Sequence, residues 1–288
     1  MIRLTEPQLD EQELEAVGQV LDTGMLVQGQ RVREFESAVE AFLGVQYARA
    51  VSSGTAALHL ALLSLGIGRG DAVLVPAFTF PAPANVVEVS GARPVLVDVD
   101  LTTYCISADL LEEAIERWSG PEKIRAVVPV HEFGAPCPMD EIMQVCNGHS
   151  LEVIEDAACA FGSKCGDRYL GAIGDVGCFS WHPRKAITTG EGGMIVSSDS
   201  TVAQRVERYR NHGIERTDDG SIDFVAAGLN YRLTEFQAAI GLRQLGKFEG
   251  QLKTRLNLVE LYYEALREVP CLSLPTQISG HTWQTFMV

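Results

Sequence analysis

Short apolar runs alternate with longer amphipathic segments along much of the chain. The runs have the length and the bounding Gly, Pro and Asp residues of buried strands, whereas the segments between them repeat apolar positions at helical spacing. This pattern predicts strands over 72–76, 93–100, 124–130 and 151–154, and helices over 109–118 and 139–146. Strands and helices that take turns in this way indicate a three-layer α/β fold, in which helices cover both faces of a mostly parallel sheet.

Helical periodicity also marks both ends of the chain. Helices are expected over 10–21 and 31–43, joined by a loop over 23–29, and again over 234–246 and 248–269. The last residues, HTWQTFMV, form an apolar run. We therefore expect a large central domain with a smaller and incomplete one after it.

Composition and charge narrow the class of protein. With 288 residues, 46% of them hydrophobic, the chain can bury a full core. Its net charge of -15, without clustered Lys and Arg, argues against a nucleic-acid partner. The seven cysteines show no CxxC spacing and no histidines at metal-ligand intervals, so we expect reduced thiols and no metal site. With no apolar signal segment and no uninterrupted apolar span, a cytoplasmic protein without membrane contact is expected.

A Ser/Gly/Thr turn precedes one of the expected helices. In AVSSGTAAL, Gly54 and Thr55 stand between an apolar run and a helix over 56–65. A helix start presents unpaired N–H groups and the positive end of the helix dipole, so such a turn can bind phosphate. A plain serine N-cap has the same pattern, and the turn alone does not separate the two.

Two further side chains stand where expected strands end. Phe80 follows the strand that ends at residue 76, and Asp156 follows the apolar pair Val153-Ile154. Ligands of a parallel sheet bind at this edge. Phe80 could stack on a flat ring or fill the core. Asp156 could serve a ligand, a structural ion pair or a helix cap, since a buried carboxylate needs a partner in each case.

A polar loop with a single lysine, Lys185, joins the apolar runs at 178–179 and 194–196, and Ser180 stands at its start. The segment TTGEGG in this loop is small enough to let a ligand approach the backbone. An amine at the rim of an apolar sheet loses hydration, which disfavours the ammonium and favours a nucleophile able to form a Schiff base with an aldehyde. The alternative is a solvated lysine on a glycine-rich hairpin.

Together these segments offer a phosphate seat, an aromatic platform, a buried carboxylate and an amine near one edge of a sheet. Pyridoxal 5'-phosphate (PLP) requires an anion site, a face to lie on, an acid that keeps its ring nitrogen protonated and a lysine for its aldehyde. The combination therefore predicts a PLP site, although no member does so alone.

Several longer motifs of the chain are similar to those of a known protein family. The chain contains, in this order, SSGTAALHLAL, PAFTF, RPVLVDVD, VIEDAA, GDVGCFSWHPRKAITTGEGGMIV, RNHG and GLNYRLTEFQAAIGLRQL. It thereby resembles the DegT/StrS sugar aminotransferases, PLP-dependent enzymes of fold type I, from the N-terminal helix to about residue 246. The resemblance implies an N-terminal helix and substrate-side loop (1–30), a large PLP-binding domain (31–247) and the start of an incomplete small C-terminal domain (248–288).

The resemblance also implies roles for individual residues. Lys185 would be the Schiff-base lysine and the base that moves a proton between the substrate carbon and the C4′ carbon of the cofactor. Asp156 would pair with the pyridinium nitrogen, and Phe80 would stack on the ring. The residues that would hold the phosphate are Gly54, Thr55, Ser180 and, reaching across the interface of a homodimer, Asn230, with Arg232 as second choice.

One position departs from the family pattern. Cys159 stands where relatives often carry Gln or His near the ring oxygen, and a thiol is a weaker donor. Its role is open between tuning the cofactor and packing. Lys185 itself separates the chain from related dehydratases, in which a histidine replaces the lysine.

The activity that the resemblance implies is transamination. An amino acid, with glutamate as first choice, would give its nitrogen to the cofactor, and a nucleotide-linked keto deoxysugar would accept it at C3 or C4. The loops 25–30 and 215–227, with a partner chain, would recognise the sugar and nucleotide. The alternatives are a cyclitol aminotransferase, a carbon–sulfur lyase on the same scaffold, and a non-catalytic PLP-binding regulatory protein.

Overall fold

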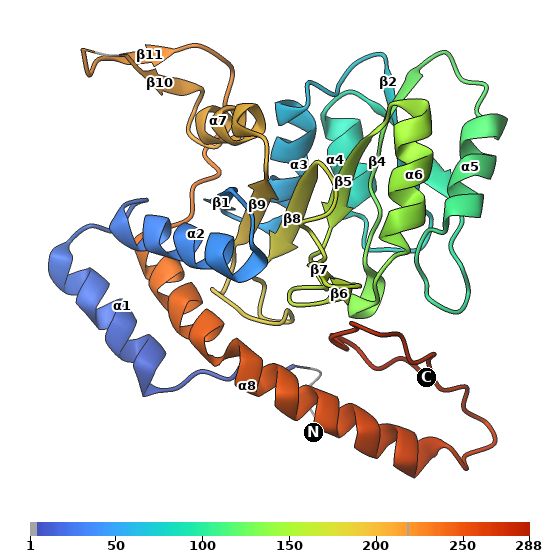
Figure 1. The fold of residues 1–288 in the computed structure, drawn as a ribbon. Helices are drawn as coiled ribbons and strands as arrows, with labels where there is room; N and C mark the ends of the chain where they lie inside the picture. Colours follow the sequence, from blue (N-terminus) through green and yellow to red (C-terminus); the bar gives the residue numbers. More distant parts are fainter. Residues whose placement is uncertain (1–4, 218) are drawn as a thin grey trace.

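A seven-stranded sheet forms the centre of the computed structural model, which describes residues 5–217 and 219–288 (Figure 1). In spatial order its strands are β1 (Tyr47–Val51), β9 (Gly193–Ser197), β8 (Val176–Ser180), β5 (Glu152–Asp156), β4 (Lys123–Val127), β2 (Asp71–Pro76) and β3 (Arg93–Val97). The five strands from β8 to β3 run parallel, and β9 runs antiparallel to both β8 and β1. The mostly parallel sheet predicted from the sequence is confirmed.

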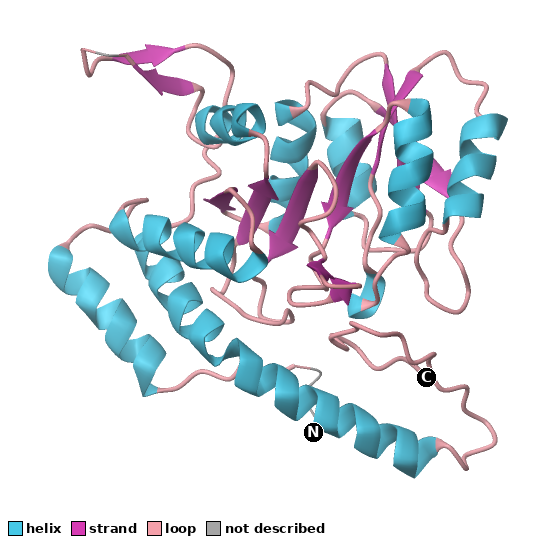
Figure 2. Cartoon of the chain, viewed as in Figure 1, coloured by secondary structure: helices cyan, strands magenta, loops and turns pink. Residues whose placement is uncertain are grey.

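Helices cover both faces of this sheet and complete the predicted three layers (Figure 2). One face carries α3 (Gly54–Ser64), α4 (Ala82–Val89) and α7 (Ser200–Tyr209); the other carries α2 (Gln30–Leu43), α5 (Ala108–Arg117), α6 (Met139–His149) and the first part of α8 (Glu235–Leu266). Successive strand residues point to opposite faces, so Val73 and Val75 join the core under α3 and α4 while Leu74 joins the other core.

The C-terminal helix differs from its prediction. Separate helices over 234–246 and 248–269 were expected, but α8 is continuous through Gly246. A glycine inside a helix costs roughly 1 kcal/mol relative to alanine. Packing offsets this cost, because Phe248 is buried in the core and Lys247 Nζ lies 2.8 Å from the Glu13 carboxylate of α1 (Glu11–Thr23). The predicted domain boundary at 247/248 falls inside this helix and stays a prediction.

Smaller elements extend from the three layers. The hairpin β10 (Ile214–Arg216) and β11 (Ile222–Phe224) projects away from the body (Figure 1). A shorter hairpin, β6 (Lys164–Cys165) and β7 (Arg168–Tyr169), and the 3₁₀ turn η1 (Glu132–Gly134) lie next to the sheet. After α8 the chain returns, and the Lys164 N–H donates to the Gly280 carbonyl at 2.9 Å. The last segment thus packs on the loops that follow β5.

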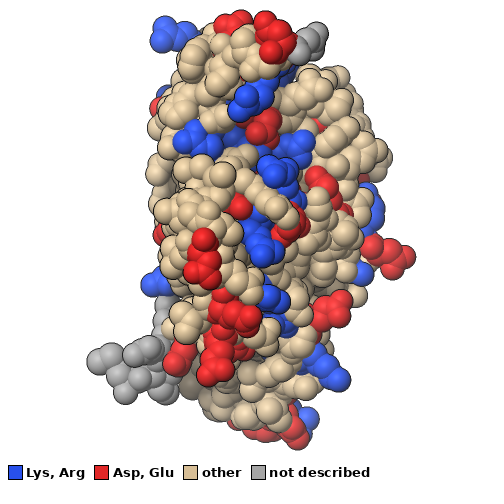
Figure 3. All heavy atoms as spheres, turned by 90° about the vertical axis from the view of Figure 1, so that its left-hand side faces the viewer, with Lys and Arg blue, Asp and Glu red and all other residues tan. Residues whose placement is uncertain are grey.

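Charged residues of both signs share the side of the molecule that carries α1 and the β10–β11 hairpin (Figure 3). Several are paired there, such as Arg49 with Glu207 at 3.4 Å and Arg31 with Glu34 at 2.9 Å. Among the described residues no helix is both long and apolar enough to cross a bilayer. The seven cysteines are all free thiols in this part of the chain.

Candidate active site

The carboxyl ends of several strands meet at one edge of the sheet. Phe80 follows β2, Asp156 is the last residue of β5, and Ser180 is the last residue of β8. Because β1 and β8 both run antiparallel to β9, the end of β1 lies at this edge too, and α3 begins there. The fold therefore places four of the predicted segments on one side of the sheet.

The start of α3 packs directly against Ser180. A Cβ added to Gly54 would lie 2.8 Å from the Ser180 Cβ, so only glycine permits this approach. Ser53 caps the helix by accepting the Ala56 N–H at 3.0 Å. The N–H groups of Gly54 and Thr55 stay unpaired within the described residues, as is usual in a first helical turn. Together with the Ser180 hydroxyl they form a site suited to an anion.

Asp156 is nearly buried, with 6% of its surface exposed. Its Oδ1 accepts the Ala158 N–H at 3.0 Å, and its backbone is held by hydrogen bonds to Pro129 and His131. Burial raises the pKa of Asp156, and the Ala158 hydrogen bond and the charge of Lys185 only partly oppose this. A cation placed against this carboxylate would relieve the cost of burying it.

Lys185 reaches the same place from the loop between β8 and β9. Its Nζ donates a hydrogen bond to the Cys159 Sγ at 3.0 Å. Burial lowers the pKa of Lys185, but Cys159, Asp156 and Glu132 together raise it by more, so the pKa lies above its usual value. Burial also raises the pKa of the Cys159 thiol, and the charge of Lys185 opposes this shift. Burial thus acts on the amine in the direction expected from the sequence, and the neighbouring acidic groups act in the opposite direction.

Glu132 faces this site and was not among the predicted residues. It lies on η1, after the strand segment that leads out of β4. Burial raises the pKa of its carboxyl; a hydrogen bond with the Thr79 side chain opposes the shift, and the charge of Asp156 adds to it. The sequence holds one signal for Glu132, namely an acidic residue just beyond the end of an expected strand. The same signal led to Asp156.

The remaining predicted residues lie around this group. Phe80 is 75% exposed, so it does not fill the core. The Ser52 N–H donates to the Tyr231 carbonyl at 2.8 Å, and Arg232 is bridged to Val51. The segment with Asn230 and Arg232 thus runs beside the start of α3 of its own chain. A contact of Asn230 with the phosphate of a partner subunit stays a prediction.

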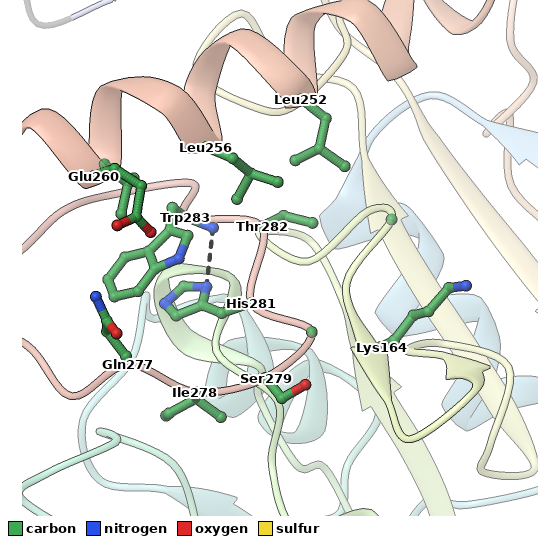
Figure 4. A pocket seen from close by; sticks show the side chains of 13 residues that line it. Lys164, Leu252, Leu256, Glu260, Gln277, Ile278, Ser279, His281, Thr282 and Trp283 are labelled. Atoms are coloured by element: carbon green, nitrogen blue, oxygen red, sulfur yellow. Dashed lines mark hydrogen bonds between the residues drawn. The ribbon is translucent and has the colours of Figure 1, made fainter.

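A cavity of about 460 Å³ lies elsewhere, between α8 and the C-terminal segment (Figure 4). Leu252 and Leu256 form one wall and His281 and Trp283 another. None of its lining residues belongs to the predicted cofactor site, so the two are distinct. Within residues 5–217 and 219–288 no group of three His, Cys, Asp or Glu side chains is arranged to hold a metal ion.

Known proteins are similar to this chain in sequence and in fold. The model of the DegT/DnrJ/EryC1/StrS aminotransferase family matches residues 7–288. The GDP-perosamine synthase of Caulobacter vibrioides is 41% identical over 266 residues, which are 92% of this chain and 70% of that protein. The chain is thus similar to an enzyme named for an amino sugar.

Solved structures of sugar-modifying enzymes have a similar fold. A candidate sugar aminotransferase of Streptococcus pneumoniae in its PMP form has a TM-score of 0.92 and 26% identity, and the match covers 99% of this chain and 78% of that one. A GDP-4-keto-6-deoxymannose-3-dehydratase with bound GDP-perosamine has a TM-score of 0.92 and 27% identity, with the same coverage. By the match of its sequence motifs, its family model and its fold, the chain belongs to the DegT/DnrJ/EryC1/StrS aminotransferase family.

Proposed function

We propose that this chain is a PLP-dependent transaminase that moves an amino group from glutamate to the keto group of a nucleotide-linked deoxysugar. The observation that carries the proposal is the hydrogen bond of 3.0 Å from Lys185 Nζ to the Sγ of Cys159, the third residue after Asp156. Lys185 and Asp156 come from different segments, and the charge of each acts on the other. Such a pair of perturbed groups in an aminotransferase family supports a catalytic role.

The residues at this edge suit PLP. The first N–H groups of α3 and the Ser180 hydroxyl would hold the phosphate, Asp156 would face the ring nitrogen, and the exposed Phe80 ring would cover one face. When bound, PLP supplies an aldehyde that captures an amine and a ring that withdraws electrons from the reacting carbon. The carboxylate of Asp156 would hold a proton on the ring nitrogen, because that charge offsets its own burial.

Lys185 would act twice in this scheme. Its Nζ would bind the cofactor and, once free, would carry a proton between the substrate carbon and C4′ of the cofactor. Proton transfer by a positioned side chain contributes about 10²–10⁴-fold to a rate. The hydrogen bond of 3.0 Å from Nζ to Cys159 Sγ supports a defined position for the free amine.

The relatives favour a nucleotide-linked sugar as acceptor. One is named GDP-perosamine synthase, and a structural neighbour holds GDP-perosamine. A homodimer is part of the proposal, because the β10–β11 hairpin stands away from the body and carries the exposed apolar side chains Ile222 and Phe224. In such a dimer Asn230 would reach the phosphate in the partner subunit.

Dehydration is the competing activity, since a dehydratase shares the fold at a TM-score of 0.92. The relevant difference is at the lysine position, where the related dehydratases carry histidine. This chain has Lys185, which supports amino transfer. A cyclitol acceptor would use the same residues, so substrate tests must separate it from a sugar nucleotide.

The test combines cofactor binding with product analysis. The purified chain should turn yellow with PLP and aminate one member of a panel of GDP-, dTDP- and UDP-linked keto sugars, with glutamate or glutamine as donor. Lys185→Ala should lose the colour and at least about 10²–10⁴-fold in turnover. Lys123→Ala, at the opposite end of the parallel strands, is the control and should keep both. Amination of cyclitol ketones alone, or no colour in the unaltered chain, would contradict the proposal.

A further inference from the structure

Side chains from two other segments act on the Lys185 amine, and one of them contacts it. Nζ donates to Cys159 Sγ at 3.0 Å. Asp156 lies three residues before Cys159, and Glu132 comes from η1. Both carboxylates act on the lysine charge. Asp156 already has a role at the ring nitrogen, whereas Glu132 and Cys159 do not.

Backbone contacts place Glu132 next to this group. The His131 N–H donates to the Asp156 carbonyl at 3.1 Å. On the other side of Glu132, a Cβ on Gly134 would come within 3.0 Å of the Cys159 carbonyl. Glu132 lies between these two anchors, so its position is tied to both Asp156 and Cys159.

Two residues with unusual backbone conformations support the turn. Phe133 and Tyr104 have φ of 56° and 59°, in the left-handed region that disfavours large side chains. Their rings pack edge to face with centroids 5.6 Å apart, and both contact Phe78. Such conformations persist where the surrounding packing enforces them, and they concentrate at functional sites. The aromatic cluster of Phe78, Tyr104 and Phe133 thus fixes the turn that carries Glu132.

We propose that Cys159 and Glu132 form a holding site for the Lys185 side chain whenever the lysine is not joined to the cofactor. Cys159 accepts a hydrogen bond from Nζ, and the charge of Glu132 acts on the ammonium from η1. The backbone of η1 is tied to Asp156 and to Cys159, so Glu132 has a defined position from which its charge favours the protonated lysine. Glu132 is thereby a positioning residue for the base. This inference rests on the proposed function, because it assumes that Lys185 leaves and rejoins a cofactor.

The other polar groups of the Lys185 loop and of the C-terminal segment differ from Glu132 in their charge or in their hydrogen-bond partners. His182 and Arg184 belong to the same loop, and the His182 Nδ1 accepts the Arg184 N–H at 3.2 Å. From the C-terminal segment, the Gln284 amide binds the Arg184 carbonyl and carries no charge. Burial lowers the pKa of His281 in that segment to about 4, so this imidazole is neutral at neutral pH.

The test measures the pH at which Lys185 becomes reactive. The full chain without PLP is labelled with an amine-specific reagent at a series of pH values, and the peptide with Lys185 is quantified by mass spectrometry. Glu132→Gln should lower the midpoint by about one pH unit, because the loss of a nearby negative charge disfavours the ammonium. Glu132→Asp keeps the charge and should restore most of the midpoint. The pH profile of turnover in the holoenzyme should move in the same direction.

Glu152→Gln is the matched control. Glu152 is also a half-buried glutamate whose pKa burial raises, but it lies at the opposite end of β5 from Asp156. It should leave the Lys185 midpoint unchanged. Cys159→Ala provides a second measurement if Glu132→Gln does not fold: it should speed labelling at a fixed pH, with Cys159→Ser between it and the unaltered chain.

The outcomes separate the two proposals. An unchanged midpoint in folded Glu132→Gln, or an unchanged labelling rate in Cys159→Ala, would overturn the holding site while the yellow holoenzyme and its turnover still support the transaminase. A chain that neither binds PLP nor transfers an amino group would overturn the proposed function itself. A shifted midpoint with the expected rescue by Glu132→Asp supports the holding site.

Discussion

Two neighbouring pairs of residues at the carboxyl edge of the sheet behave in opposite ways. His131 and Glu155 are completely buried, and His131 Nε2 lies 3.0 Å from the Glu155 carboxylate. The same carboxylate accepts backbone N–H groups from Gly171, Ile173 and Gly174 at 2.6 to 2.8 Å. Although burial opposes it, these hydrogen bonds lower the pKa of Glu155. We call His131 and Glu155 the closed pair, because the Glu155 carboxylate is saturated with hydrogen bonds.

The next residue along each segment, Glu132 and Asp156, faces the cofactor site instead. Burial raises the pKa of both carboxyls, because neither has hydrogen bonds enough to offset it. Adjacent residues of a strand point to opposite sides, which separates Glu155 from Asp156 on β5, whereas Glu132 follows His131 as the first residue of the turn η1. Glu155 therefore stabilises the fold, whereas Glu132 and Asp156, which we call the open pair, face the cofactor site. Saturation with hydrogen bonds, more than burial, distinguishes the two kinds of carboxylate.

The largest expected effect is on the closed pair. Glu155→Ala should lower the free energy of unfolding by about 3–5 kcal/mol, because it leaves His131 and three buried N–H groups without their acceptor. Denaturant titration measures it. Glu112→Ala is the control, since His149 and Glu112 form a similar pair at 2.8 Å on the surface, and its cost should be about 0–1 kcal/mol. An equal loss of unfolding free energy in Glu155→Ala and Glu112→Ala would show that the buried pair stabilises the fold no more than the surface pair.

Substitution in the open pair should change the affinity for PLP more than the free energy of unfolding. Asp156→Asn should keep or increase the free energy of unfolding at neutral pH, because it removes a buried charge that lacks sufficient partners. It should weaken PLP binding about 10- to 100-fold, which corresponds to the roughly 1.5–3 kcal/mol of a hydrogen bond to a charged group. Equilibrium dialysis measures the affinity. Destabilisation as large as that of Glu155→Ala would count against the comparison.

The pH dependence of stability should have opposite signs at residues 155 and 156. The folded pKa of Asp156 is raised, so its contribution to stability is present below the ordinary value of about 3.9 and is lost as pH rises through the folded pKa. The folded pKa of Glu155 is lowered, so its contribution is present above about 4.3 and is lost as pH falls through the folded pKa.

Unfolding free energies of Asp156→Asn and Glu155→Gln over a pH series check this. Relative to the unaltered chain, Asp156→Asn should gain stability as pH rises from about 4, whereas the penalty of Glu155→Gln should shrink in acid. Parallel pH curves for the two variants would be inconsistent with the assigned roles.

The smallest expected effect belongs to Phe80. Because its ring is 75% exposed, Phe80→Leu should change the free energy of unfolding by less than about 0.5 kcal/mol. It should weaken PLP binding by about 2- to 10-fold, the range expected for a lost aromatic contact of roughly 0.5–1.5 kcal/mol. Phe179→Leu, at a fully buried ring, is the control and should affect folding but not the cofactor. Unchanged PLP affinity in Phe80→Leu would remove the stacking role.

Most of the framework was predictable because it depends on local pattern. The strands and helices from residue 72 to residue 156 follow from apolar periodicity, and the family follows from motifs such as those at Gly54 and Lys185. The break expected near Gly246 was wrong, because glycine is only a weak signal within a helix and the packing of Phe248 and Lys247 outweighs it.

The amino-acid sequence by itself determined the order of the strands and helices, the family, and the lysine and aspartate on which the proposed chemistry depends. Only the tertiary structure decided which acids lie near the lysine and which are saturated with hydrogen bonds. It paired His131 with Glu155, brought Lys185 to Cys159 and gave the lysine acidic neighbours that raise its pKa. The reason is physical: a pKa depends on charges and hydrogen bonds within a few ångströms, and here those partners come from segments far apart in the chain.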